Sequence, residues 1–211
     1  LVGMNCVNNT AVNQNLVLNL MAYIDYEEEQ PQFKIPEDSN IQWHNATDYT
    51  SNEPVRKSPQ YNLVYDGWNR NEMRTSQSLS GFVLGKGFGR DKGDKVNYEI
   101  NILPGKEKGM IGFRYNTPKG KTSTFQVKGI TESRLELQGT GEYNIVSIPY
   151  TCKEPGKYTL ELISEGTHST DLDGFFIGSE EDIKQIKILP RKLSFIPEIK
   201  SGKTKQDFIL K

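Results

Sequence analysis

The 211-residue sequence lacks the features that mark membrane-spanning and nucleic-acid-binding proteins. No apolar run approaches the roughly 18 residues that a bilayer-spanning helix needs. Lys and Arg are scattered along the chain and the formal net charge is −1, so there is no basic patch for a polyanion. We therefore expect neither a membrane span nor a nucleic-acid partner.

Cysteine and histidine are also scarce, with two of each. Cys6 and Cys152 permit one disulfide but no cysteine-only metal site, and the sequence leaves open whether they pair. His44 and His168 lie far apart and lack the spacing of an H-E-x-x-H motif. No G-x-S-x-G nucleophile motif is present, and GKGFGR at 85–90 lacks the ending of a phosphate-binding loop. We expect a domain that is not an enzyme, with a small hydrolase or lyase as an alternative.

What the sequence does contain favours β-structure. Gly (19) and Pro (10) supply turns, and aromatic residues make up 10% of a chain whose hydrophobic content is only 35%. Short stretches alternate apolar with polar residues, bounded by turn residues roughly every 8–12 positions. These stretches are KVNYEINI, GMIGFRYN, TSTFQVKG, RLELQG, YNIVSIPY and GKYTLELIS. We predict an all-β sandwich, because a single sheet could not bury both of its faces.

The chain divides into three predicted parts. Residues 1–38 contain NLVLNLMAYIDY, whose spacing fits a strand or a helix; we favour a strand, followed by an extended linker with prolines. Residues 39–180 form the sandwich domain. Residues 181–211 are an extension with two further apolar alternations, too short to fold alone. We expect this extension to pair with the N-terminal strand or to dock on the sandwich.

Six short segments, taken in order, resemble motifs of the carbohydrate-binding modules of families 6 and 35. They are HNATDYTS (44–51), GDKVNYEINI (93–102), FRYN (113–116), GTGEY (139–143), PGKYTLEL (155–162) and DLDGFFI (171–177). The resemblance covers about 135 residues and implies the jelly-roll fold of galactose-binding-like domains. It also implies where a ligand would bind.

A sugar site is the first implication of the resemblance. Family 6 modules clamp a sugar ring between two aromatic residues, beside an asparagine. Matching by motif, Phe88 and Tyr143 take the aromatic positions and Asp171 replaces the asparagine. Aromatic rings stack on the C–H faces of sugars, and a carboxylate accepts paired hydroxyl hydrogen bonds. The alternatives are that Phe88 belongs to the core and that Tyr143 is an ordinary turn aromatic.

A structural calcium ion is the second implication. In these modules the last aspartate, here Asp173, holds calcium together with acidic residues of the first strand. Asn45 and Thr47 stand at those first-strand positions, so the implied metal ligands are these three residues, two of them neutral. Calcium prefers hard oxygen ligands, including carboxylates and carbonyls. The alternative is that Asp173 accepts hydrogen bonds from backbone amides at a strand edge.

An insert that lies outside the family pattern, SPQYNLVYDGWNRNEMRTSQ, follows the first of these segments. Its YDGWNRNE turn places Trp68 beside Asn69 and Arg70, which combine a stacking surface with planar hydrogen-bonding groups. We include these three among the ligand-binding candidates, with His168 from the loop before Asp171. The alternatives are that Trp68 plugs the sandwich and that His168 is only solvated.

Together these observations predict a non-catalytic carbohydrate-binding module of a secreted or cell-surface bacterial protein. Its partners would be a polysaccharide or oligosaccharide and a catalytic domain of the same parent protein. The alternative is a structural β-sandwich domain of a larger glycoside hydrolase, without sugar binding of its own.

Overall fold

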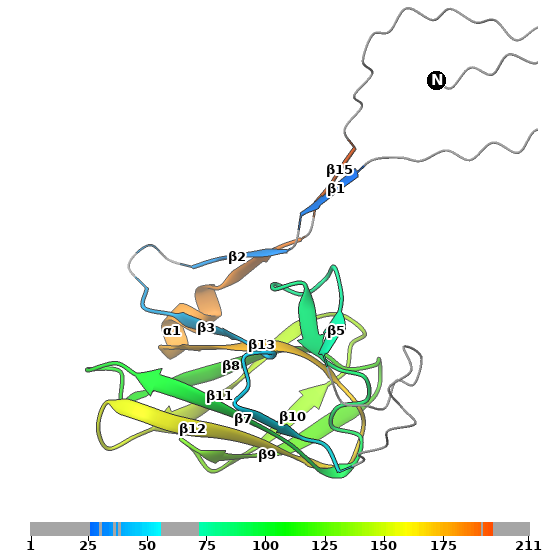
Figure 1. Ribbon diagram of the computed structural model, residues 1–211. Helices are drawn as coiled ribbons and strands as arrows, with labels where there is room; N and C mark the ends of the chain where they lie inside the picture. The colour runs from blue at the N-terminus through cyan, green and yellow to red at the C-terminus, as the bar shows by residue number, and fades with distance from the viewer. Residues whose placement is uncertain are drawn as a thin grey trace, which may run out of the picture. The chain divides into compact units, whose positions relative to one another are not determined.

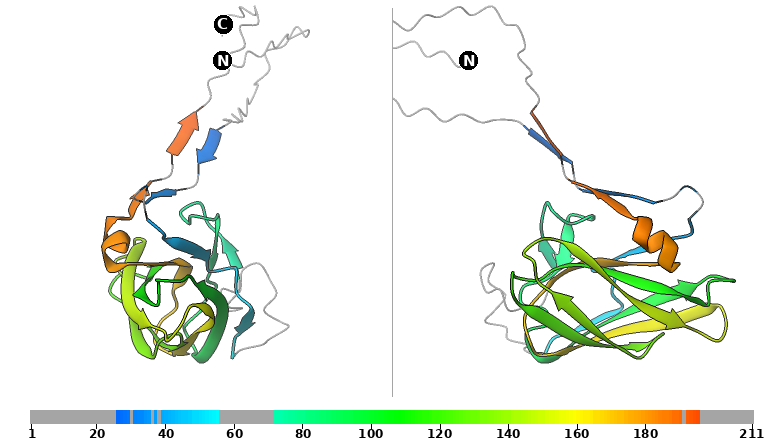
Figure 2. Two further views of the ribbon diagram at one scale, coloured as in Figure 1. Left: turned by 90° about the vertical axis from the view of Figure 1, so that its left-hand side faces the viewer. Right: turned by 180° about the vertical axis from the view of Figure 1, so that it is seen from behind.

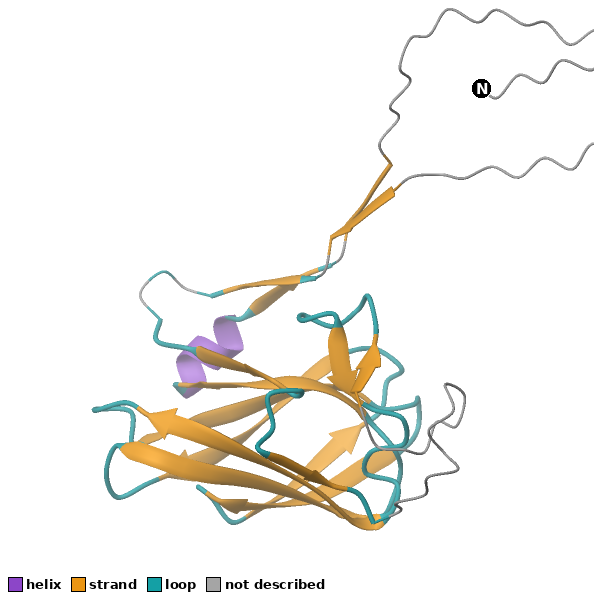
Figure 3. Cartoon of the chain, in the orientation of Figure 1, coloured by secondary structure: helices purple, strands orange, loops and turns teal. Residues whose placement is uncertain are grey.

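The structure is a computed structural model and describes residues 26–29, 31–35, 37, 39–55, 72–190 and 192–195. Strands account for nearly all of its regular structure (Figures 1 and 3). The strands are β1 (Tyr26–Glu29), β2 (Gln32–Lys34), β3 (Gln42–Asn45), β4 (Ser51–Glu53), β5 (Glu72–Arg74), β6 (Phe82–Leu84), β7 (Lys92–Ile102), β8 (Lys108–Asn116), β9 (Thr122–Gly129), β10 (Ser133–Gln138), β11 (Asn144–Thr151), β12 (Gly156–Glu165), β13 (Asp171–Gly178), β14 (Lys187–Leu189) and β15 (Lys192–Phe195). The helix, α1, spans Glu180–Gln185.

Two antiparallel sheets form a sandwich. One has the strand order β10-β9-β12-β7-β4; the other has the order β11-β8-β13-β6-β5, with β3 also paired to β13. Consecutive strands from β7 to β13 cross repeatedly between the two sheets, as in a jelly roll (Figure 1). The predicted all-β sandwich is therefore confirmed, and each of the six stretches predicted as strands is one.

Alternation along the strands explains why these sequences form a sandwich. In β7, Val96, Tyr98 and Ile100 are at most 1% exposed, whereas Glu99 between them faces solvent. Aromatic side chains join the two sheets, since the ring of Tyr98 meets that of Phe175 edge-on at 5.0 Å between centroids. The inner, apolar faces of the two sheets thus enclose one core that is rich in aromatic residues.

The outer face of the six-stranded sheet is covered by a short ribbon and the helix. Strands β2 and β14 pair antiparallel, and both they and α1 lie on the side of β13 that faces away from the core (Figures 1 and 2). The rings of Phe33 in β2 and Trp43 in β3 lie 5.4 Å and 4.5 Å from that of Phe176 in β13. The two ends of the sandwich domain therefore pair with each other and also dock on it.

The helix α1 was not predicted. Its N-cap is Ser179, whose side chain accepts a hydrogen bond from the backbone N–H of Asp182 at 3.0 Å. Ile183 is its buried residue, and it packs over Gly112 of β8. Among the described residues, no helix is long and apolar enough to cross a membrane.

The compact unit that contains the sandwich runs from Glu29 to Lys192, which is wider than the predicted 39–180 because the β2–β14 ribbon belongs to it. Strands β1 and β15 pair as a separate two-stranded sheet and fall largely in a second unit. Most of the predicted N-terminal strand, at 16–25, lies outside the described residues. Cys152 is a free thiol, and its Sγ donates to the Glu107 carbonyl oxygen at 3.4 Å.

Candidate functional site

An ion pair buried in the outer face of the six-stranded sheet lies at the centre of the candidate site. The Asp173 carboxylate is fully buried and is paired with Nη1 of Arg114, whose side chain is only 5% exposed. The backbone N–H of Leu79 also donates to both carboxylate oxygens, at 3.1 Å and 3.2 Å. A buried carboxylate is costly unless it is paired and hydrogen-bonded, so Arg114 accounts for an aspartate inside an apolar strand.

A register shift in β13 places Asp173 beside Arg114. Leu172 lies opposite Tyr115 and Gly174 lies opposite Arg114, so Asp173 is the extra residue of a β-bulge. Gly174 is needed there, because a Cβ atom at this position would collide with the His44 carbonyl oxygen and with the Trp43 ring. The bulge directs Asp173 away from the core while Phe175 re-enters it.

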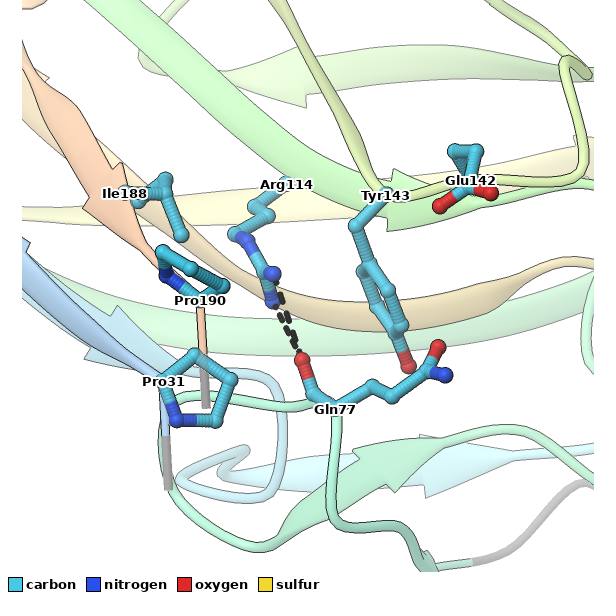
Figure 4. Close-up of a pocket in the computed structure, with 7 residues that line it drawn as sticks. All are labelled: Pro31, Gln77, Arg114, Glu142, Tyr143, Ile188 and Pro190. Carbon is cyan, nitrogen blue, oxygen red and sulfur yellow. Dashed lines mark hydrogen bonds between the residues drawn. The ribbon is translucent and has the colours of Figure 1, made fainter. Parts of the chain in front are cut away.

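Arg114 is held from three sides. Besides Asp173, its Nη1 and Nη2 donate to the backbone carbonyl oxygen of Gln77 at 3.3 Å and 3.2 Å (Figure 4). Its Cζ atom lies 4.2 Å from the centroid of the Tyr143 ring, which is cation–π geometry. The guanidinium therefore fixes the Gln77 backbone and the Tyr143 ring in place.

A pocket with a volume of about 420 Å³ opens at this point. It has an apolar wall from the β2–β14 ribbon and a polar wall from the loops before β6 and β11. Figure 4 shows the Arg114 guanidinium between the ribbon residues and the Tyr143 ring, with the Gln77 side chain extending toward Tyr143. The lining residues are Pro31, Gln77, Arg114, Glu142, Tyr143, Ile188 and Pro190.

Asp171 lies near the pocket as a second, unpaired carboxylate. It pairs through its backbone with Asn116, and Asn144 pairs with Tyr115, so Tyr143 and Asp171 lie near the same end of β8, at the two strands that flank it. No described residue donates a hydrogen bond to the Asp171 carboxylate, and Gly85 leaves room for its Oδ1 atom.

Burial shifts the acid–base equilibria of this cluster. Burial raises the pKa of Asp171 to about 6. It also raises the pKa of Asp173 to about 6, against the opposing effects of Arg114 and the Leu79 N–H. Burial raises the pKa of Tyr143 as well, and the charges of the two aspartates add to that rise. At pH 7 both carboxylates are therefore mostly ionised, and Tyr143 is neutral.

Of the predicted ligand-binding residues, the structure brings Tyr143 and Asp171 together but not Phe88. Phe88 is fully buried and stacks on Phe125 at 5.3 Å between ring centroids, so its ring offers no face to a ligand. It belongs to the core, which was the alternative. His168 is exposed in the loop whose backbone passes Gly89, and it does not line the pocket. The predictions for Trp68, Asn69 and Arg70 lie outside the described residues.

The predicted calcium ligands do not fit a cation. The positive charge next to Asp173 is already supplied by Arg114. The side-chain oxygen of Asn45 accepts a hydrogen bond from Trp43 Nε1 at 2.8 Å, and its amide donates to Asp48 at 2.9 Å. Among the described residues, no three acidic, histidine or cysteine side chains are grouped as metal ligands would be. A calcium ion beside Asp173 would meet the guanidinium charge, so we derive no role for it there.

Several residues of the pocket were missed by sequence reasoning. Arg114 entered the sequence interpretation only as part of the FRYN motif, although it is the one charged residue in the buried part of β8. A buried aspartate needs a cation, and this pattern was the available signal. Gln77, Glu142 and the ribbon residues carry no such signal, because only the tertiary fold brings them together.

Comparisons with known proteins found structural neighbours only. No protein-family model matches the sequence, and no curated protein matches it. The chain is similar to a family 6 carbohydrate-binding module (17% identity, TM-score 0.45, 66% of this chain and 94% of that one). It is also similar to a family 35 carbohydrate-binding module from Clostridium thermocellum (14% identity, TM-score 0.41, 72% of this chain and 99% of that one).

A third neighbour is an uncharacterised protein from Listeria monocytogenes EGD-e, in complex with α- and β-D-glucose, magnesium and calcium (16% identity, TM-score 0.46). The similarity covers 53% of this chain but only 11% of that protein. The chain thus corresponds to a small part of that protein's length.

Proposed function

We propose that this domain is a non-catalytic carbohydrate-binding module that holds a polysaccharide or oligosaccharide in the pocket around Tyr143. The observation that carries the proposal is the composition of the pocket. A half-buried aromatic ring, an apolar wall and two polar side chains meet around about 420 Å³. Small-molecule sites combine apolar surface with a few directed polar groups in this way, and sugars present both C–H faces and hydroxyls.

The lining residues have distinct roles in this proposal. Tyr143 and the wall of Pro31, Ile188 and Pro190 contact the C–H faces of a sugar. The Gln77 amide and the Glu142 carboxylate hydrogen-bond its hydroxyls. Both are exposed, so a bound sugar would remain partly hydrated and the affinity would be modest.

Arg114 is a positioning residue in this proposal. Its guanidinium is engaged by Asp173, by the Gln77 carbonyl and by the Tyr143 ring, and it therefore fixes the loops before β6 and β11 relative to each other. A ligand-binding surface that is already ordered loses less conformational entropy on binding. We assign no catalytic step to the domain.

The wider setting is also part of the proposal. The domain would attach a catalytic domain of the same parent protein to polysaccharide. It would do so outside a bacterial cell or on its surface.

The test is a glycan array probed with the chain and with two tyrosine variants. Tyr143→Ala removes the aromatic ring of the pocket and is expected to abolish binding. Tyr158→Ala is the matched control, since Tyr158 is also half-buried but its hydroxyl bonds the Glu154 carbonyl oxygen at 2.7 Å, outside the pocket. It should bind as the unmodified chain does.

Two results would count against the proposal. If the unmodified chain binds no glycan, the structural alternative is the better account: a sandwich whose ends pair in a ribbon and which serves as a spacer. If both tyrosine variants bind equally well, the sugar site lies elsewhere on the molecule.

A further inference from the structure

The charges around the pocket indicate which class of sugar it takes. We propose that the pocket selects sugars by charge. It binds a sugar with a free amino group more tightly than the neutral sugar of the same linkage, and it rejects the corresponding uronate. This inference rests on the proposed function, because it concerns the same pocket.

The cation of the pocket is not free to bind an anion. Arg114 is the only cation among the lining residues that the structure describes. Its charge is balanced by Asp173, and both of its terminal nitrogens donate to the Gln77 carbonyl oxygen. A uronate that approached Arg114 would compete with a buried carboxylate, whose loss of partner is costly.

Two other carboxylates, in contrast, have no cationic partner among the described residues. Glu142 is exposed in the wall of the pocket, and no described residue forms an ion pair with it. Asp171 adds a second negative charge, close enough to Tyr143 to help raise the pKa of its phenol. Among the described residues that line the pocket or lie next to it, these carboxylates therefore leave an excess of negative charge at pH 7.

The neighbouring lysines do not cancel this excess. Lys119 lies beside Gly141 in the turn that leads to Glu142, but the two side chains form no ion pair among the described contacts. Lys34 and Lys187 are exposed in the ribbon, where they alternate with Phe33 and the pocket residue Ile188 and so point away from the pocket.

A sugar ammonium group would meet Glu142 as the partner in an ion pair, whereas a sugar carboxylate would meet a like charge. Because Glu142 is exposed, the preference is small: about two- to fivefold in Kd between amino and neutral sugars. It should weaken as salt is added, since screening acts on exposed charges over about 10 Å at 0.1 M.

The experiment uses three trisaccharides with one β-1,4-linked backbone, made of glucosamine, glucose or glucuronate. Binding to the whole chain is measured by calorimetry at pH 7 and low salt. The expected order of affinity is glucosamine, then glucose, then glucuronate. In Glu142→Gln the ratio between the glucosamine and glucose affinities should move toward one. In Glu132→Gln, which removes the same charge from the loop between β9 and β10 of the opposite sheet, this ratio should not change.

The outcomes separate this inference from the proposed function. Equal affinities, tighter binding of glucuronate, or an unchanged ratio in Glu142→Gln would each overturn charge selection. In the first two cases, the glycan array with Tyr143→Ala still decides whether the pocket binds sugar. Binding of none of the three trisaccharides would also overturn the inference, and the array then shows whether the proposed function falls with it.

Discussion

The two outer faces of the sandwich use charged residues in opposite ways. On the five-stranded sheet, charges lie in exposed pairs, such as Lys157 with Glu99 at 2.7 Å and Arg134 with Glu165 at 3.2 Å. On the six-stranded sheet, Arg114 and Asp173 are buried together beneath a covering ribbon. One face is thus adapted to water, and the other encloses a pocket.

The charged residues of the two faces differ in what they contribute to the protein. Exposed ion pairs contribute little to stability, about 0–1 kcal/mol each. A buried pair contributes no more than an apolar pair of similar size would, because both charges must lose their hydration. The buried pair is therefore better explained by what it positions, namely Gln77 and Tyr143 around the pocket, than by stability.

The largest expected effect comes from breaking the buried pair. Arg114→Met leaves Asp173 buried without a cation and should lower the free energy of unfolding by about 3–5 kcal/mol at pH 7. Arg114 holds the pKa of Asp173 down to about 6, so the variant takes up the proton at higher pH than the unmodified chain does, and the loss should shrink as the pH falls toward 6. Urea denaturation at pH 7 and pH 5 measures both effects.

A double variant tests the explanation. Arg114→Met combined with Asp173→Leu removes both charges and should recover most of the lost stability. It should nevertheless fail to bind the glycans that the unmodified chain binds, because Tyr143 and Gln77 lose their support. A double variant that is as unstable as Arg114→Met would mean that the ion pair is not the cause of the loss.

A smaller loss of stability is expected where the β2–β14 ribbon packs on the six-stranded sheet. Phe33→Ala removes a half-buried ring that packs against Phe176 and should cost roughly 1–3 kcal/mol, less than a fully buried phenylalanine. Amide hydrogen exchange should speed up in β2 and β14 while β7 and β12 remain protected. Equal loss of protection in all four strands would show that the ribbon and the sandwich unfold together.

Replacing the unpaired carboxylate should stabilise the fold. The folded pKa of Asp171 is raised from 3.8 to about 6, so the folded state binds its proton more tightly than the unfolded state does. Stability from this group is present below pH 4 and is lost as the pH rises to 6. Asp171→Asn should therefore gain roughly 1–2 kcal/mol at pH 7, after allowance for partial exposure, and nothing at pH 4. A variant that is less stable at pH 7 would contradict this assignment.

The smallest effect is expected on the five-stranded sheet. Arg134→Ala removes exposed contacts with Glu136 and Glu165 and should change the free energy of unfolding by less than about 0.5 kcal/mol. Chemical denaturation checks the value. A loss near that of Arg114→Met would remove the contrast between the two faces.

Alternation made the sandwich predictable from sequence. In KVNYEINI, the alternation of apolar and polar residues predicts which side chains enter the core, because strand side chains alternate between the two faces of a sheet. Motif order selected Tyr143 and Asp171, which the structure brings to the same end of β8; their role in binding stays a prediction. Phe88 was misplaced, because a glycine-rich segment around an aromatic residue is equally typical of an exposed loop and of a buried loop anchor.

The centre of the site required the tertiary structure. The bulge at Asp173 shifts the register of β13 by one residue and so brings the carboxylate to Arg114. No local pattern specifies this pairing across 59 residues. The apolar wall of Pro31 and Pro190 depends in the same way on the pairing of β2 with β14, which lie far apart in the chain.

The central claim is that sugar binds on the outer face of the six-stranded sheet. The most direct test is a nitrogen-15 NMR titration of the chain with the glycan that binds best on the array. The account predicts shift changes concentrated at Gln77, Arg114, Glu142 and Tyr143, with β9 and β10 unaffected. Changes concentrated around Phe88 and His168, or on the five-stranded sheet, would contradict it.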